Sequence, residues 1–187
     1  MNIGFAMCGS FCTYQKVFNA METVASIHTV IPIFSHSAYT IDSRFGTAQD
    51  HIEKAAQICG REPLHTIAQV EPIGPKKLLD ALVIAPCTGN TLAKLAHSIA
   101  DGPVTMAAKS HLRNGRPVLL AVSTNDALAG AAENIGKLLG RKNYYFVPFG
   151  QDDPEKKPTS MVADFSKLLP ALEAALDGQQ FQPMLTT

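Results

Sequence analysis

Apolar residues are arranged along this chain in two alternating ways, which predict two kinds of element. Short continuous apolar runs are typical of strands buried on both faces of a sheet. Between these runs, apolar residues recur every three or four positions, which is the spacing of an amphipathic helix. The runs predict six strands, at residues 3–7, 28–34, 65–68, 81–85, 116–122 and 144–148. Such alternation predicts an α/β fold, a doubly wound three-layer sandwich with a mostly parallel six-stranded sheet.

Capping residues and glycines mark the helix boundaries. Thr47 with Asp50 is typical of a helix start, and Gly60 and Gly115 are typical of helix ends. Pro86 lacks an N–H group and is expected to end its strand. The predicted helical patterns cover residues 14–24, 47–59, 92–99, 104–114, 128–139 and 161–176, the last as one amphipathic closing helix.

Several segments have no apolar period. Residues 35–46 are irregular and long enough to suggest a functional loop. Residues 71–77 form a Pro/Gly turn, and the tail at about 178–187 is expected to fray. Pro32 argues for an edge position of its strand, because a proline removes a ladder hydrogen bond.

Length and charge limit the classes of protein to consider. The 187 residues suit a single domain over 1–187, and the formal net charge is zero. A balanced charge gives no electrostatic reason to expect nucleic acid or an anionic membrane as a partner. The first residues predict a strand and not a signal peptide. The four cysteines form no Cys-x-x-Cys pair, so we expect free thiols in a reducing cytoplasm and no metal site.

The most informative stretch runs from Leu82 to Asp101, where a strand, a polar bend and a helix follow one another. The bend contains Thr88, Gly89, Asn90 and Thr91. In open α/β sheets, ligands bind at the carboxyl ends of strands, and helix N–H groups there favour anions. The same residues are also good helix caps, so the bend alone leaves a ligand site and a capped turn as alternatives.

Two other strands end in similar bends. The first strand ends at Gly9 and Ser10, where glycine lets the backbone approach a ligand and serine adds a hydroxyl. This is not Gly-x-Gly-x-x-Gly, so no dinucleotide fingerprint is present at that place. The strand at 116–122 leads into Ser123, Thr124 and Asn125. Two neighbouring strands with polar ends make a natural ligand crevice.

The run Ala85-Pro-Cys-Thr-Gly-Asn-Thr91 resembles the Pro-x-x-x-Asn-Thr signature of the flavoprotein family that includes the homo-oligomeric flavin-containing cysteine decarboxylases. The similarity covers about twenty residues around this run without a gap. It implies that FMN is held at this bend, with the Gly9-Ser10 turn on the phosphate side.

The chain departs from the decarboxylases at two places. Their catalytic histidine corresponds to Pro72, which cannot move a proton, and His65 is out of register. Their substrate clamp, Pro-x-Met-Asn-x-x-Met-Trp, is replaced by Val-Ser-Thr-Asn-Asp, in which Asn125 alone matches. Decarboxylase chemistry is therefore disfavoured, and a different substrate is expected.

Over nearly its whole length the chain resembles the B subunits of dipicolinate synthase from endospore-forming bacteria. This implies a part in oxidising a dihydro- or hydroxytetrahydro-dipicolinate to dipicolinic acid during sporulation, in the mother-cell cytoplasm. The implied partner is the A subunit of dipicolinate synthase, which is a nicotinamide-type Rossmann protein that would carry NAD(P). FMN-binding residues would be Gly9, Ser10, Thr88, Asn90, Thr91, Ser123, Thr124 and Asn125.

A dianionic dicarboxylate substrate also needs cations. Candidates are Arg44, Lys76, Lys77 and Lys109, although the two lysines at 76 and 77 are more typical of a solvated turn. No catalytic residue is assigned. The family further implies a homo-oligomer, a trimer or a multiple of trimers.

Two other functions stay open. The chain could be a non-redox accessory protein that stabilises the A subunit and holds a phosphate or a pyridine dicarboxylate where FMN would sit. A flavin-dependent cysteine-type decarboxylase is the weaker alternative, because of Pro72 and the altered clamp.

Overall fold

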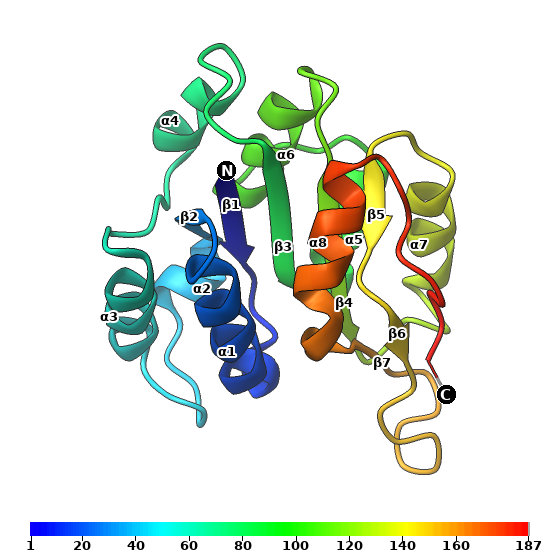
Figure 1. Ribbon diagram of the computed structural model, residues 1–187. Coiled ribbons are helices and arrows are strands. Elements are labelled where there is room, and N and C mark those ends of the chain that lie inside the picture. The colour runs from blue at the N-terminus through cyan, green and yellow to red at the C-terminus, as the bar shows by residue number, and fades with distance from the viewer. Residues whose placement is uncertain (187) are drawn as a thin grey trace.

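A computed structural model describes residues 1–186, and its core is one sheet covered by helices on both faces. In Figure 1, α1 and α8 lie on the near face of the sheet, and α5, α6 and α7 lie behind it. Helix α1 packs against α8, and α5 packs against α6 and α7. This is the three-layer α/β arrangement that the alternating pattern predicts.

The strands are β1 (Asn2–Met7), β2 (Thr29–Phe34), β3 (Ala81–Cys87), β4 (Val118–Thr124), β5 (Tyr144–Phe146), β6 (Phe149–Gly150) and β7 (Met161–Ala163). The sheet order is β2-β1-β3-β4-β7-β6, and β5 also pairs with β4. Strands β1 to β5 are mutually parallel, whereas β7 is antiparallel to both β4 and β6. The sheet therefore has seven strands instead of the expected six.

The helices are α1 (Tyr14–Ala25), α2 (His36–Thr40), α3 (Ala48–Cys59), α4 (Ile67–Val70), α5 (Gly89–Ala96), α6 (Pro103–Leu112), α7 (Ala132–Leu139) and α8 (Leu168–Leu176). Short 3-10 turns are η1 (Phe11–Thr13), η2 (Glu71–Ile73) and η3 (Phe165–Lys167). Thr47 and Asp50 form the expected capping box of α3, and Gly60 is left-handed at its end. Gly115 is also left-handed, with a φ of 69°. No helix within residues 1–186 has the length and apolar character needed to cross a membrane.

Pro32 lies in a strand position that tolerates a residue without an N–H group. Strand β2 is at the edge of the sheet, as the proline predicts. Pro86, by contrast, does not end its strand: β3 continues to Cys87, with a register shift against β4 between Ile84 and Cys87. The shift accommodates the proline, so the strand tolerates the missing N–H group.

Three predicted elements are wrong. Residues 65–68 are not a strand, because Thr66 and Gln69 form a capping box that starts α4. Residues 35–46 are not wholly irregular, because Ser35 caps α2. Residues 161–176 are not one helix: their first part is β7, which pairs with the end of β4.

The tail is also better ordered than expected. The amide oxygen and nitrogen of Gln180 bond the backbone N–H (2.8 Å) and carbonyl (2.7 Å) of Phe146. Leu185 forms a parallel bridge with Phe149. The side chain of Gln180 and the backbone pairing at Leu185 thus hold the tail against the sheet.

Candidate functional site

Three adjacent parallel strands, β1, β3 and β4, end at the same edge of the sheet, and their polar bends touch. The hydroxyl oxygens of Ser10 and Ser123 are 2.8 Å apart. Thr91 donates a hydrogen bond from its hydroxyl to the Cys8 sulfur, at 3.3 Å. We number the bends after β1, β3 and β4 as the first, second and third. A Cβ atom built on Gly89 would lie 2.8 Å from the hydroxyl of Thr124, so only glycine lets the second and third bends approach this closely.

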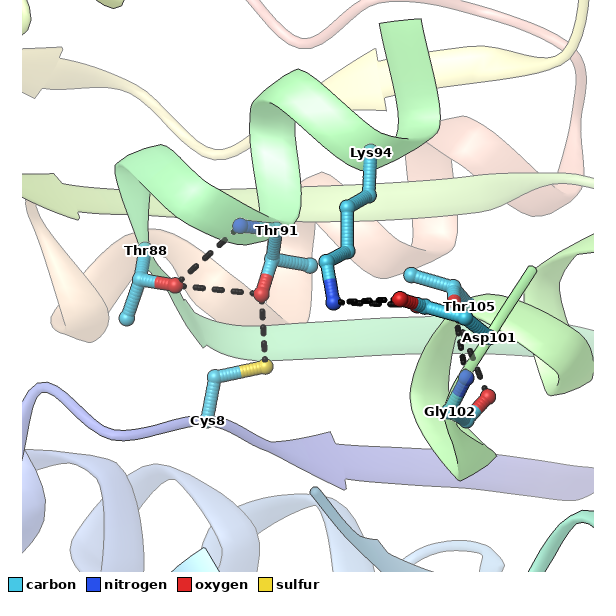
Figure 2. A network of polar contacts seen from close by, with 7 residues as sticks. All are labelled: Cys8, Thr88, Thr91, Lys94, Asp101, Gly102 and Thr105. Carbon is cyan, nitrogen blue, oxygen red and sulfur yellow. Dashed lines mark hydrogen bonds and ion pairs between the residues drawn. The ribbon is translucent and has the colours of Figure 1, made fainter. Parts of the chain in front are cut away.

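The second bend is both a helix cap and an open donor site. Thr88 is the N-cap of α5, and its hydroxyl accepts from the Thr91 N–H group at 3.3 Å and lies 3.0 Å from the Thr91 hydroxyl. Figure 2 shows this chain of contacts from Thr88 through Thr91 to Cys8. The N–H groups of Gly89 and Asn90 have no partner among the described residues. Asn90 is exposed at the surface of the bend. The cap uses Thr88 and Thr91, which leaves the Asn90 side chain and two N–H groups for a ligand.

A cleft of about 400 Å³ opens beside these bends. Of the predicted residues, Gly9, Thr88, Asn90 and Thr91 line it. Its other walls come from Ser35, His36 and Ser37, which lie in the predicted functional loop at 35–46, and from Lys94 with Asp101 to Thr105, to which the sequence assigned no ligand role. The volume lies within the roughly 300–1,000 Å³ of small-molecule pockets.

The remaining predicted flavin residues lie next to the cleft and not on its wall. Ser10 is tied to Ser123, which is buried. The hydroxyl of Thr124 donates to the carboxylate of Asp126. The Asn125 carbonyl accepts from Thr159 at 2.7 Å, and the Asn125 side chain is exposed. The serine and threonine hydroxyls are thus bonded within the chain, and Asn125 is the member of the third bend that is open to a ligand.

The charged groups of the cleft neutralise each other. Lys94 forms an ion pair with Asp101 at 2.9 Å, shown in Figure 2. The hydrogen bond from Lys94 lowers the pKa of Asp101, which keeps that carboxylate ionised. Thr105 stabilises the neighbouring turn, since its hydroxyl accepts from the Gly102 N–H group at 3.3 Å. The cleft therefore offers an anion neutral N–H and O–H donors and little net positive charge.

The buried environment of the thiols at the base of the bends makes them unreactive. Cys8 and Cys87 are both buried. Burial raises the pKa of Cys8 to about 11 and that of Cys87 well above its ordinary value. Since the thiolate is the nucleophile, neither cysteine is suited to nucleophilic chemistry at neutral pH. All four cysteines are free, as expected, and no cluster of metal-ligating residues is found among residues 1–186.

None of the four predicted substrate cations lines the cleft. Lys76 and Lys77 precede β3, which places them at the amino edge of the sheet, opposite the cleft. Arg44 lies over the ring of Phe45, 4.9 Å from its centre. Lys109 is on the second half of α6 and lines a different cavity. Lys76 and Lys77 therefore fit the solvated turn and do not face the bends, because residues before a parallel strand and residues after it lie at opposite edges of the sheet.

The residues that sequence reasoning missed carry one recognisable signal. Ser35, His36 and Ser37 directly follow β2, as Gly9 and Ser10 follow β1. Polar residues right after a strand were the criterion for the other bends, and the same criterion applied to β2 would have found these three. Nothing in the sequence indicates that Lys94 and Asp101 pair across the cleft.

The sequence of the chain matches one known protein family over most of its length. Residues 1–156 match the flavoprotein family. The chain belongs to the flavoprotein family. It is 45% identical to the B subunit of dipicolinate synthase from Bacillus subtilis (strain 168) over 184 residues, which cover 98% of this chain and 92% of the relative.

Solved structures agree on the fold. The crystal structure of the dipicolinate synthase B subunit from Bacillus halodurans C is similar, with a TM-score of 0.91, 45% identity, and coverage of 100% of this chain and 96% of that one. The FMN-dependent cysteine decarboxylase SpaF has a TM-score of 0.70 at 21% identity, over 94% of this chain and 97% of its own. The second likeness concerns the fold alone, whereas the first includes the sequence as well as the fold.

Proposed function

We propose that this chain is the B subunit of a dipicolinate synthase. It takes part in the oxidation of a dihydro- or hydroxytetrahydro-dipicolinate to dipicolinic acid during sporulation. The observation that carries the proposal is the 45% identity to a dipicolinate synthase B subunit over 98% of this chain. The relative's name also implies a second subunit, so the partner we propose is the A subunit of the same enzyme, with NAD(P) bound there.

We further propose that the cleft holds the phosphate end of FMN. The N–H groups of Gly9, Gly89 and Asn90 are without partners among the described residues, and the last two belong to the first turn of α5. Such groups, together with the helix dipole, favour an anion. The hydroxyl of Ser37, whose Cβ atom would be 3.5 Å from a Cβ built on Gly9, adds a donor beside Gly9. This donor set fits a phosphate without needing a net cationic pocket.

Each bend then has a defined task. Gly9 and the start of α5 bind the phosphate through the backbone, and Asn90 contacts the ligand with its amide. Thr91, Cys8 and Thr88 do not touch the ligand but fix the second bend relative to the first. Asn125, exposed on the third bend, is placed to contact the ring or the substrate. When bound, the flavin would supply the two-electron chemistry of the oxidation.

Reconstitution tests the reaction. The purified chain, the A subunit of a dipicolinate synthase, and the two together are incubated with dihydrodipicolinate and with NAD(P)⁺ as the two-electron acceptor, and dipicolinate is measured by chromatography. We expect the mixture to form product faster than the A subunit by itself, and the chain to contain flavin by its absorbance. No increase in product with a flavin-loaded chain would contradict the proposal.

The same assay separates the other functions. A colourless chain that still raises turnover of the A subunit indicates a non-redox accessory role. Release of carbon dioxide from a cysteinyl peptide by the chain alone would indicate a decarboxylase. That result is not expected, because Pro72 in η2 has no group that can transfer a proton.

A further inference from the structure

A second cavity, of about 520 Å³, lies behind the cleft and is separate from it. We call it the α5–α6 cavity. Thr105 lines both spaces and divides them. Thr105, Lys109 and Leu112 follow one another at helical spacing along α6, so they present one face of that helix to the cavity. The other walls come from the end of α5 and from the connection between α7 and β5.

The walls are mainly apolar. Leu95 and Leu112 contribute aliphatic side chains, and Ile99 is 47% exposed, a large fraction for such a residue. The ring of Tyr144 forms part of the lining, and its hydroxyl has no partner among the described residues. Burial raises the pKa of Tyr144 to about 12, so the hydroxyl remains a hydrogen-bond donor at neutral pH. Apolar walls with a few polar groups are typical of sites for small organic ligands.

The charge at this cavity has one sign. Lys109, Arg141 and Lys142 line it, and its lining contains no aspartate or glutamate. Lys109 and Lys142 are exposed and form no ion pair within the part of the chain that the structure describes. Arg141 is held in place by hydrogen bonds to the carbonyl oxygens of Leu95 (2.9 Å) and Ala96 (2.6 Å). One fixed cation and two free ones thus surround an apolar space.

The backbone at the rim is unusual as well. Ser98 and Asn143 line the cavity, and both have positive φ, 59° and 69°. Among non-glycine residues of the described chain, only Lys77 shares this feature. The left-handed conformation of Ser98 ends α5, because the Ser98 N–H group donates to the Leu95 carbonyl (3.1 Å) and the Ile99 N–H group donates to the Lys94 carbonyl (2.8 Å).

We propose that the α5–α6 cavity binds an aromatic carboxylate, with its ring between Leu95, Leu112 and Tyr144 and its carboxylate on Lys109 and Lys142. Charge complementarity selects an anion, and the apolar walls select a ring over a sugar or an inorganic phosphate. The site is distinct from the flavin cleft, and this inference does not depend on the proposed oxidation.

Calorimetry with benzene-1,3-dicarboxylate tests it, using the full chain. We expect saturable binding that is about tenfold weaker in the double variant Lys109→Met, Lys142→Met, because two partly exposed charge pairs are lost. Tyr144→Phe should weaken binding by about threefold through one lost hydrogen bond. Lys76→Met is the matched control: it removes an exposed lysine at a site away from the cavity, and the affinity should not change.

Three results would overturn the proposal. The first is no saturable binding by the folded wild-type chain. The second is binding that survives in the double variant but is lost in Gly9→Ala, since the probe would then occupy the flavin cleft. The third is a change of oligomeric mass in the double variant by light scattering, which would make the cavity an interface between copies. Flavin binding, measured in parallel, reports on the proposed function separately.

Discussion

Thr91 shows how one side chain can connect two bends of the site. It is 7% exposed, its N–H group is capped by Thr88, and its hydroxyl donates to Cys8. Thr91, one of the residues to which the sequence assigned a ligand role, therefore holds the two bends together. Asn90, its neighbour, is the side chain that faces outward.

Thr91→Val tests this role. Valine keeps the shape but cannot donate to the Cys8 sulfur, so we expect a loss of about 1 kcal/mol in the free energy of unfolding. Urea denaturation measures it. Thr23→Val is the control, because Thr23 is exposed on α1 and its hydroxyl bonds only its own helix, so its effect should stay within about 0.5 kcal/mol. Equal losses in both variants would contradict the linking role.

The thiols give a second test. Cys12 is exposed, whereas burial raises the pKa of Cys8 to about 11 and that of Cys59 to about 12. We expect iodoacetamide at pH 8 to alkylate Cys12 in the native chain well before Cys8, Cys59 or Cys87. Peptide mass spectrometry identifies the labelled residues, and all four should react in urea. Native labelling of Cys8 at the rate of Cys12 would show that the base of the bends is open.

Strands made of continuous buried apolar residues could be predicted from the sequence. Strands that form only by pairing with residues distant in the sequence could not. Strands β3 and β4 are apolar and fully or almost fully buried, so their patterns are unambiguous. Met161 and Val162 fit the helical spacing of the residues after them, yet they pair with Thr124 and Ser123. That pairing depends on where β4 ends in space, which a local pattern does not contain.

Helix α6 carries a pH-sensitive group. His111 is fully buried, and its Nε2 atom lies 3.0 Å from the Pro117 carbonyl. Burial lowers its pKa to about 4, below the ordinary value of 6.5. The unfolded chain therefore binds this proton first, so the stabilisation is present above about pH 6.5 and is lost as the pH falls toward 4.

Acid denaturation measures this loss. We expect His111 to account for up to about 3 kcal/mol of the decrease between pH 7 and pH 4. His111→Gln keeps an N–H donor but does not titrate, so its stability should fall less across this window. Wild type, measured in parallel, gives the reference slope. An unchanged slope in His111→Gln would contradict the assignment.

The C-terminal tail allows a test of whether its contacts stabilise the sheet. Gln180→Ala removes both side-chain hydrogen bonds to Phe146, and we expect unfolding to become easier by about 1–2 kcal/mol. Gln179→Ala replaces the same residue type at an exposed position. The Gln179 side chain forms no hydrogen bond with the described residues, so this variant should have little effect. Thermal unfolding followed by circular dichroism compares the two. Identical midpoints for both variants and wild type would mean that the tail does not stabilise the sheet.

Over the whole molecule, four of the residues that line the cleft could be predicted as ligand residues from the sequence. Gly9, Thr88, Asn90 and Thr91 could be found because each follows an apolar strand, and parallel strands share one carboxyl edge. Lys94 and Asp101 could not be predicted, because their place at the cleft depends on how the segment after α5 folds back over that edge. The four predicted substrate cations do not line the cleft. For Lys76 and Lys77 the reason is similar: they are close in sequence to β3 but precede it, so they lie at the opposite end of that strand.

A flavin phosphate in the cleft has to reach the backbone at Gly9. A Cβ atom added there would meet nothing closer than 3.5 Å, so Gly9→Ala should leave stability unchanged. Gly136→Ala on α7, where no atom lies within 4 Å, controls for the substitution itself. The added methyl group at residue 9 would, however, occupy the space in which the phosphate approaches.

The most direct measurement is therefore a titration of the apo-protein with FMN and with riboflavin, followed by flavin fluorescence. We expect wild type and Gly136→Ala to bind FMN alike, riboflavin at least about tenfold more weakly for want of the phosphate, and Gly9→Ala to lose about tenfold in FMN affinity. Equal affinity of the folded Gly9→Ala variant and wild type for FMN, or equal affinity of wild type for FMN and riboflavin, would contradict a phosphate site at these bends.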